Sequence, residues 1–307
     1  MRNALYERFG FGESDPHRRP VIGSMHVAGG FVVPALFGVE IRFSDSQSPW
    51  PVPANLSREE ILALDVPEIE KTLPMDRFIA DMNELSAEFG FVVGDLNTEG
   101  VLDNALVLRG QQLFTDLFDD PALVNHLFAV VAETQLRVAS CVKARTGTCS
   151  VATNRMVLHA DPRLYVHANC SVQMVSPAIY RRFVLPWELH LAGRLQPYGV
   201  HHCGNNLHIF AGLYEKIRPV FVDVGWGSNI GHCRQALPDV FFSLRLSPAR
   251  MLRQPAAAIR ADIRQLLQAG YKPGRVGVCC INMDHGTPDE NIREMVDAVR
   301  ESSASRS

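Results

Sequence analysis

The sequence contains no uninterrupted apolar run of the roughly 20 residues that a membrane-spanning helix needs. Its first residues, MRNALYERFGFGESDPHRR, lack the apolar core of a secretory signal. We therefore expect a cytoplasmic protein with no membrane association. The sequence also has no Lys/Arg-rich run and carries a net charge of −3, so its electrostatics give no reason to expect nucleic acid as a partner.

The cysteines are few, odd in number and irregularly spaced, which argues against a disulfide framework. There are seven of them, at positions 141, 149, 170, 203, 233, 279 and 280. We therefore expect reduced thiols that are available to bind a metal.

Length and composition favour one large globular unit. The chain has 307 residues, of which 47% are apolar and 21% charged, and it shows no low-complexity block or obvious linker. An α/β barrel commonly occupies this length as one domain. We expect a single domain over residues 1–301 with an irregular N-terminal segment, followed by a flexible polar tail at 302–307.

Short β-branched or aromatic runs alternate with stretches of helical period, which predicts βα units and a parallel sheet. Predicted helices include residues 75–89, closed by Gly90, a long helix from Asp120-Pro121, and a helix from Ser176-Pro177 that Pro186 kinks. An eighth strand, which the pattern does not locate, would close a (β/α)₈ TIM barrel. The seven predicted strands are 19–25, 91–95, 155–160, 198–203, 219–224, 240–245 and 276–281.

The most informative motif is YGVHHCG, at residues 198–204. Side chains alternate along a strand, so His201 and Cys203 project to one side and His202 to the other. A second thiol pair, Cys279 and Cys280, closes the last predicted strand. Because Val276, Val278 and Cys280 share a face, we choose Cys280 as the partner and keep Cys279 as the alternative.

One imidazole and two thiolates suit Zn²⁺, and three protein ligands leave a fourth position for substrate. The sequence therefore predicts a catalytic zinc site on His201, Cys203 and Cys280. In a barrel this chemistry lies at the carboxyl ends of the strands.

Further polar residues follow other predicted strands. We expect Asp95, Asn97 and Glu99 to hydrogen-bond or deprotonate the substrate; helix capping and loop hydrogen bonding are the alternative. Cys170 is either an additional soft ligand or a buried thiol. Asp223 is expected to orient His201. The predicted substrate-binding residues are His26, Asn169, Asp223, Trp226 and Asn229.

Three segments resemble the uroporphyrinogen decarboxylase superfamily: HHCGNN, MVSPAIYRRFVLPWELHLA and DHGTPDENIREMVDAV. The likeness runs from about Gly90 onward, with a weaker match in RPVIGSMHVAGG. Within the superfamily the chain is more similar to the corrinoid-linked zinc methyltransferases, which include methylcobamide:coenzyme M methyltransferases and the methyltransferases of O-demethylase systems. That branch binds zinc through His-x-Cys and one distant Cys, which here correspond to His201, Cys203 and Cys280.

The resemblance implies a uroporphyrinogen decarboxylase-like TIM barrel that moves a methyl group to a small thiol or from a methyl ether, with zinc as Lewis acid. The direction of transfer stays open. No Asp-x-His-x-x-Gly corrinoid signature is present, and Asp284-His285-Gly286 has the wrong spacing. A separate corrinoid (cobalamin) protein is therefore the implied partner, and a homodimer is an open alternative to a monomer.

The chain departs from true uroporphyrinogen decarboxylases in one segment. Where these carry an arginine-containing MRQAGR-like stretch, residues 25–30 here read MHVAGG, which would hold a polyanionic porphyrinogen poorly. A lyase acting on a small carboxylic acid is thus the second hypothesis, with Arg245 as its acid-binding residue. A third is a non-catalytic scaffold whose structural zinc has Cys170 or Cys279 as fourth ligand.

Overall fold

In the computed structural model, which describes residues 8–9, 20–23, 28–95, 97–148, 161 and 163–304, the strands form three sheets. Five parallel strands run in the order β5-β6-β7-β8-β9, β1 pairs with β4 in parallel, and β2 pairs with β3 antiparallel. The predicted α/β class is therefore confirmed. The strands are β1 (Val21–Gly23), β2 (Ile41–Arg42), β3 (Trp50–Pro51), β4 (Val93–Asp95), β5 (Tyr165–Asn169), β6 (Tyr198–His202), β7 (Phe221–Val224), β8 (Phe241–Arg245) and β9 (Val276–Cys279).

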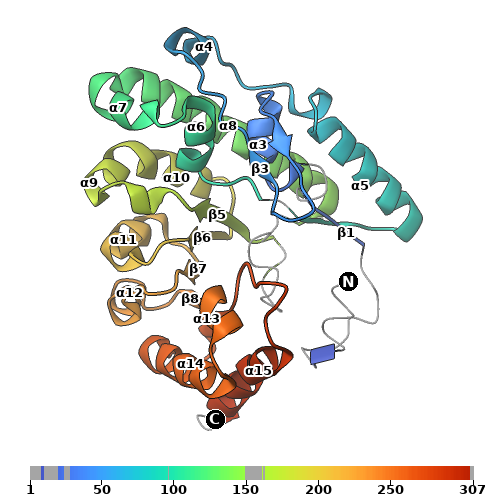
Figure 1. Cartoon of the computed structure of the whole chain (residues 1–307). Helices are drawn as coiled ribbons and strands as arrows, with labels where there is room; N and C mark the ends of the chain where they lie inside the picture. The colour runs from blue at the N-terminus through green and yellow to red at the C-terminus, as the bar shows by residue number, and fades with distance from the viewer. Residues whose placement is uncertain are drawn as a thin grey trace.

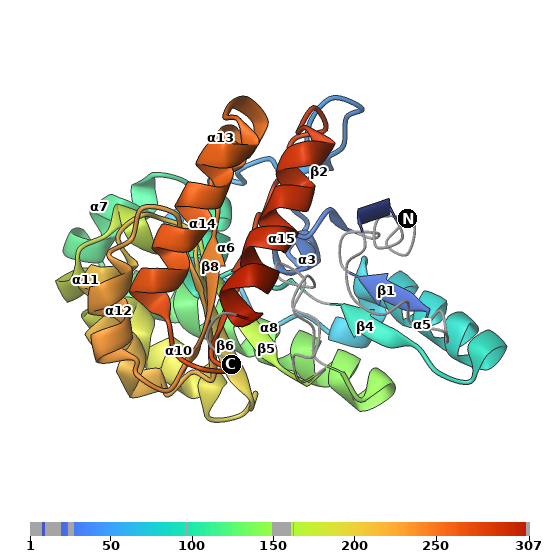
Figure 2. The ribbon, with the colours of Figure 1, turned by 90° about the horizontal axis from the view of Figure 1, so that it is seen from below.

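Helices connect the parallel strands and cover one side of the five-stranded sheet. Helices α11 and α12 lie on one side of the molecule, and α5 lies with β1 and β4 on the other (Figure 1, Figure 2). The helices are α3 (Val32–Leu36), α4 (Arg58–Leu62), α5 (Met75–Phe89), α6 (Val101–Arg109), α7 (Gln112–Asp119), α8 (Pro121–Thr146), α9 (Pro177–Ile179), α10 (Leu185–Ala192), α11 (Leu207–Tyr214), α12 (Ile230–Ala236), α13 (Pro248–Arg253), α14 (Ala256–Gly270) and α15 (Asp289–Ala304). None of the described helices combines the length and the apolar character needed to cross a membrane.

The two faces of the five-stranded sheet differ in chemistry. Paired residues in a parallel ladder point to the same side, and the register pairs Ala168 with His201, His201 with Asp223, and Asp223 with Ser243. We call this the polar face. The opposite, helix-facing side carries Val200, Val222, Phe242 and Leu244, which are buried in the main hydrophobic core.

The helix boundaries agree closely with the local sequence signals. Helix α5 ends at Gly90, whose φ of 77° is the left-handed conformation that glycine tolerates best. Helix α8 begins at Pro121, and the Asp120 side chain accepts a hydrogen bond from the backbone N–H of Leu123 at 3.2 Å. Helix α15 continues to Ala304, so residues 302–304 are helical rather than part of a tail.

Strand β5, Tyr165–Asn169, pairs in parallel with β6 and is not among the strands predicted from the sequence. Its residues YVHAN are all buried, including the polar His167 and Asn169. The predicted strand at 155–160 lies outside the described residues.

The helix after Ser176 differs from a simple proline kink. Residues Tyr180–Val184 form a π-helical turn between α9 and α10, and Pro186 lies in the first turn of α10, where its missing N–H costs nothing. The irregularity thus precedes the proline. Ser176 caps the segment by accepting a hydrogen bond from the N–H of Ile179.

Candidate functional site

The ends of β5 and β6 bring three potential metal ligands together. One ligand atom each from Cys170, His201 and Cys203 lie within 4.8 Å of one another. Cys170 directly follows β5, and Cys203 directly follows β6 and donates its backbone N–H to the Asn169 carbonyl at 3.4 Å. The end of β7 can approach the end of β6 because residue 225, just after β7, is glycine. A Cβ there would lie 1.9 Å from the Gly204 carbonyl oxygen.

His201 is the oriented imidazole of this group. Its Nδ1 forms a hydrogen bond with Oδ2 of Asp223, and both side chains are buried. Nε2 is therefore the ring atom that faces the cysteines and would bind a metal once it has given up its proton. Burial alone would lower the pKa of His201, but the charge and hydrogen bond of Asp223 raise it to about 9.

The neighbouring His202 points away from the polar face, as strand alternation predicts. Its Nδ1 contacts the Tyr214 hydroxyl at 2.8 Å, and its Nε2 contacts Oδ1 of Asn206 at 2.9 Å. Because both ring nitrogens already have partners on the helix-facing side, His202 cannot join His201 at the same site.

The two cysteines of the group have pKa values that are shifted in opposite directions. The pKa of Cys203 is lowered because Cys170 and His201 donate hydrogen bonds to its sulfur, with a further contribution from Arg245. Conversely, the pKa of Cys170 is raised because its thiol donates to Cys203 and because it is buried near Asp103 and Glu99. These interactions favour the thiolate form of Cys203, the form of cysteine that binds metals. The imidazole and sulfur donors match the preference of zinc.

A second group adjoins the first through Cys170. Ligand atoms of Glu99, Asp103 and Cys170 also lie within 4.8 Å of one another. Glu99 has a φ of 54°, rare for a residue with a side chain, and the Asn97 amide donates a hydrogen bond to Oε1 of Glu99 at 2.6 Å. Burial, followed by the nearby Asp103 carboxyl, raises the pKa of Glu99 to about 7. Glu99 can therefore gain or lose a proton near neutral pH.

The loop that carries Glu99 is held by a buried amide from the long helix. Nε2 of Gln135, on α8, donates hydrogen bonds to the Thr98 carbonyl at 3.1 Å and the Glu99 carbonyl at 2.6 Å. The Asn104 side chain also donates to the Thr98 carbonyl, at 2.8 Å. These contacts fix the unusual backbone of Glu99 and hence the direction of its carboxyl group.

Asp103 is a site residue that the sequence analysis missed. Its carboxylate accepts hydrogen bonds from the backbone N–H groups of Gly100 at 3.1 Å, Cys170 at 3.2 Å and Ser171 at 2.7 Å. It therefore ties the start of α6 to the end of β5. The position of Asp103 three residues after Gly100 was a sequence signal for helix capping, whereas its link to residues 170–171 depends on the tertiary fold.

A cavity of about 450 Å³ opens beside Glu99, Asp103 and Cys170. Its remaining walls are largely apolar, which suits a small organic ligand held by a few polar groups. The apolar residues of the lining are Phe31, Pro51, Pro53, Leu106 and Val107, and Asn104 and Ser171 complete it.

Arg245 points toward the same site. It is 8% exposed, it contributes a hydrogen bond to Cys203, and its charge acts on Asp223. Its Nε and Nη1 have no hydrogen-bond partner among the described residues. An arginine directed into the site is what the lyase hypothesis requires, because two unpaired N–H groups can bind a carboxylate.

Cys280, predicted as the third zinc ligand, is not part of either group. The register pairs Arg245 with Cys279, so Cys279 rather than Cys280 lies on the polar face. Cys280 does share a face with Val276 and Val278, as predicted, but that face packs against hydrophobic residues of α14 and α15. The prediction of Cys280 from strand alternation therefore assumed that the face of Val276 and Val278 is the inner one, whereas in the structure it is the helix-facing one.

Asn169, predicted to bind substrate, also turns toward the helices. Its amide nitrogen donates to Oε1 of Glu188 at 2.9 Å and to the Tyr214 hydroxyl at 3.2 Å. It lies one residue before Cys170, and alternation along the strand sends it to the opposite side. His26 and the side chain of Asp95 lie outside the described part of the chain.

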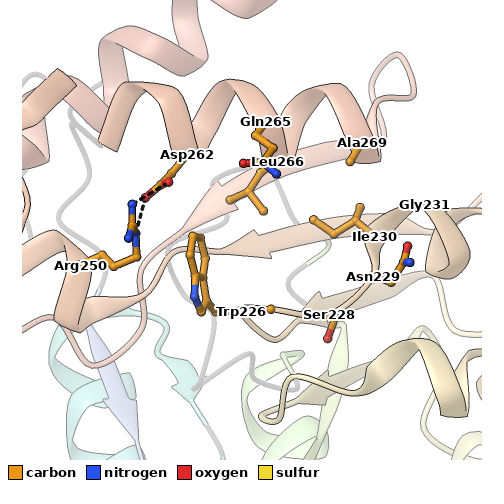
Figure 3. A pocket seen from close by; sticks show the side chains of 11 residues that line it. Trp226, Ser228, Asn229, Ile230, Gly231, Arg250, Asp262, Gln265, Leu266 and Ala269 are labelled. Atoms are coloured by element: carbon orange, nitrogen blue, oxygen red, sulfur yellow. Dashed lines mark hydrogen bonds and ion pairs between the residues drawn. The ribbon is translucent and has the colours of Figure 1, made fainter. Parts of the chain in front are cut away.

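Trp226 and Asn229 line a different cavity, of about 510 Å³, between the β7–α12 loop and α14 (Figure 3). The guanidinium of Arg250 lies 5.8 Å from the Trp226 ring centroid and forms an ion pair with Asp262 at 2.7 Å. Asn229 caps α12 by accepting a hydrogen bond from the N–H of His232 at 3.1 Å. These two residues are therefore not brought together with His201 and Cys203.

Comparison with known proteins gives a consistent picture. The profile of the Uroporphyrinogen decarboxylase (URO-D) family matches residues 27–302. Uroporphyrinogen decarboxylases from two strains of Thermus thermophilus are each 32% identical over 143 residues, which cover 43% of this chain but only 40% of each relative. The structure of a methyltransferase from Methanosarcina mazei is similar with a TM-score of 0.70 at 16% identity, covering 97% of this chain and 83% of that one. This last likeness establishes a shared fold, and the family match over most of the chain establishes that the protein belongs to the uroporphyrinogen decarboxylase family.

Proposed function

We propose that the protein is a zinc-dependent methyltransferase that moves a methyl group between a corrinoid protein and a small thiol or methyl-ether substrate. The observation that carries this proposal is the convergence of His201, Cys203 and Cys170 beside a cavity that also contains Glu99. The proposal includes closure of the parallel strands into one (β/α)₈ barrel, a fold supported by the likeness to the Methanosarcina mazei methyltransferase.

The donor atoms of the site fit zinc. His201 and Cys203 would hold the ion, with a further thiolate that the sequence analysis assigned to Cys280. When bound, zinc supplies Lewis acidity toward the sulfur or oxygen atom that gains or loses the methyl group. Asp223 keeps the His201 ring in the tautomer that presents Nε2, because its carboxylate accepts the Nδ1 proton.

Glu99 is proposed to exchange a proton with the substrate heteroatom. Its pKa of about 7 lets the carboxyl act as base in one direction and as acid in the other. Asn97 orients the carboxyl group by its hydrogen bond. The apolar walls contributed by Phe31 and Pro51 would exclude water from the reacting atoms.

A separate corrinoid protein is the proposed partner, because the HHCGNN motif resembles that of corrinoid-linked methyltransferases while the chain lacks a corrinoid signature. Of the two enzyme classes named among its similar proteins, methyl transfer is the better supported by the donor set. A decarboxylase that binds a porphyrinogen would not need a cluster of imidazole and thiols.

The proposal is tested by metal analysis and cobalamin spectroscopy on the purified protein. We expect about one zinc per chain, and a spectral change when methylcobalamin is mixed with a thiol acceptor or cob(I)alamin with a methyl ether. Cys203→Ser should bind zinc more weakly, so that the purified variant holds less than one zinc per chain, and should lose activity, whereas Cys233→Ser, a buried cysteine at the α12 core, should keep both. Wild-type protein that contains no zinc and leaves both cobalamin spectra unchanged would contradict the proposal.

Arg245 favours a second candidate, a lyase acting on a small carboxylic acid. Its two unpaired and buried N–H groups could bind a carboxylate next to Cys203. This candidate predicts carbon dioxide release from small carboxylic acids, lost in Arg245→Gln, with no reaction of cobalamin. Retained release in that variant would eliminate it.

A further inference from the structure

We infer that Cys170, rather than Cys280, supplies the second thiolate of the metal site. This inference rests on the proposed function, since it assigns a ligand of the same site. It changes the ligand set from the one that the HHCGNN resemblance implies, in which the third ligand comes from the end of the last strand.

Strand order places Cys170 next to Cys203. Ala168 pairs with His201 and Asn169 with His202, so the next rung of the ladder brings residues 170 and 203 side by side on the polar face. Neighbouring strands lie about 4.8 Å apart, and two sulfurs on one tetrahedral zinc lie about 3.8 Å apart. Ligands from adjacent strand ends can therefore reach one ion after small side-chain rotations.

Cys280, after the last strand, is less favourably placed than Cys170 in both its position in the sheet and the side to which it points. In the sheet, β7 and β8 separate β9 from β6, so the residues of β9 do not adjoin His201 along the ladder. The sulfur of Cys280 is buried among Leu246, Met251 and Ile263 on the helix-facing side. Reaching the polar face would require reversal of the alternation at the end of β9.

Cys279 lies on the polar face but is already engaged elsewhere. It accepts a hydrogen bond from the Ser243 hydroxyl at 3.1 Å and donates one to Oδ1 of Asp223 at 3.7 Å. It therefore contacts the residue that orients His201, and it is not part of the ligand group of Cys170, His201 and Cys203.

The backbone at Cys170 is fixed by hydrogen bonds, and its side chain borders a cavity. Asp103 accepts the N–H groups of Cys170 and Ser171, which fixes the start of the loop. Cys170 lines the 450 Å³ cavity together with Glu99. An ion held by His201, Cys203 and Cys170 would therefore lie beside that cavity, which Glu99 also lines.

Cobalt substitution tests the assignment without measuring activity. The metal-free protein is titrated with Co²⁺, and the near-ultraviolet thiolate-to-cobalt charge-transfer band is measured per bound cobalt. Cys170→Ser and Cys203→Ser should each reduce this band to about half, because each removes one of two thiolates. Cys280→Ser should keep the full band and wild-type affinity. Circular dichroism of each variant verifies that the fold is retained.

Alkylation of the wild-type protein gives a second measurement that depends on no substitution. Bound zinc should protect Cys170 and Cys203 from iodoacetamide, as read by peptide mass spectrometry. A full band in Cys170→Ser, a halved band in Cys280→Ser, or unchanged alkylation of Cys170 with zinc bound would overturn the inference and leave the proposed function standing. Wild-type protein that binds neither zinc nor cobalt would overturn both.

Discussion

The contact between His201 and Asp223 is the most consequential pair of residues in the site. Both side chains are buried. Among the described residues, Asp223 is the charged group that contacts His201 Nδ1 and fixes the ring. A carboxylate behind a metal-binding histidine sets the ring tautomer and increases the basicity of the other nitrogen. In the proposed zinc site, the polar face would thus contribute more than ligand atoms to metal affinity.

Replacing Asp223 by Asn should weaken zinc binding without removing a ligand. The amide is nearly isosteric but carries no charge, so His201 loses both its electrostatic support and its firm tautomer. We expect the zinc dissociation constant to rise roughly 10- to 100-fold, measured by competition with a chromogenic chelator. Unchanged affinity would mean that Asp223 serves only the fold.

A matched control is Asp239→Asn. Asp239 forms an ion pair with Lys272 on the surface, with 84% of its side chain exposed. The same chemical change there removes a carboxylate far from the cysteines, and zinc affinity should stay at the wild-type value.

Residues within one strand could be predicted, whereas residues from different strands could not. His201 and Cys203 follow from alternation along a single strand, and the structure agrees. Cys170 depends on the register between β5 and β6, and β5 was not located from the sequence. The placement of Cys280 has a related cause: the sequence of β9, Val276 to Cys279, does not show which of its two faces is the inner one.

At the scale of elements, β5 shows why polar residues can hide a strand. His167 and Asn169 interrupt the apolar run, and in the structure they face Glu188 on α10 beneath the helical layer. Helices such as α5 and α8 were easier to predict because their periodicity and caps are local signals. A strand that buries its polar residues in a network with a later helix leaves no such signal.

Glu188 makes this interface sensitive to pH. It accepts hydrogen bonds from Asn169 at 2.9 Å and from the Tyr180 hydroxyl at 2.8 Å, and His167 lies 3.9 Å away. Burial raises its pKa from 4.5 to about 8 in spite of these hydrogen bonds. The folded protein therefore binds this proton more tightly than the unfolded chain does. The resulting stability is fully present below pH 4.5 and is lost as pH rises toward 8.

Glu188→Gln should remove this contribution. As pH rises from 5 to 8, the free energy of unfolding of the wild type should fall relative to that of the variant by up to ~1.4 kcal/mol per pH unit. Urea unfolding at several pH values measures it. The exposed Glu215→Gln is the control for loss of one carboxyl group. A difference that does not vary with pH would show that Glu188 is ionised in the folded protein.

At the scale of the whole molecule, the cavity beside Cys170 is assembled from distant parts of the chain. Phe31 precedes α3, Pro51 ends β3, Leu106 lies on α6, and Cys170 follows β5. The antiparallel β2–β3 pair and its neighbours thus form part of the wall over the ends of the parallel strands. No periodicity in the sequence predicts such a wall, because it depends on how the N-terminal segment folds back over the sheet.

The molecule offers two cavities of similar volume, and filling each in turn should show which one takes the substrate. Leu106 lines the cavity of about 450 Å³ beside Glu99, and Leu266 lines the cavity of about 510 Å³ beside Trp226. Tryptophan at either position adds bulk to a partly buried wall.

Leu106→Trp should raise KM for the small substrate at least roughly tenfold, since a substrate displaced from its pocket loses ~1.4 kcal/mol or more of binding. The zinc content should stay unchanged. Leu266→Trp should leave KM at the wild-type value. Steady-state kinetics with the substrate identified by the cobalamin assay measures both KM values. The opposite pattern would move the substrate site to Trp226 and Asn229, two of the residues predicted from the sequence to bind substrate.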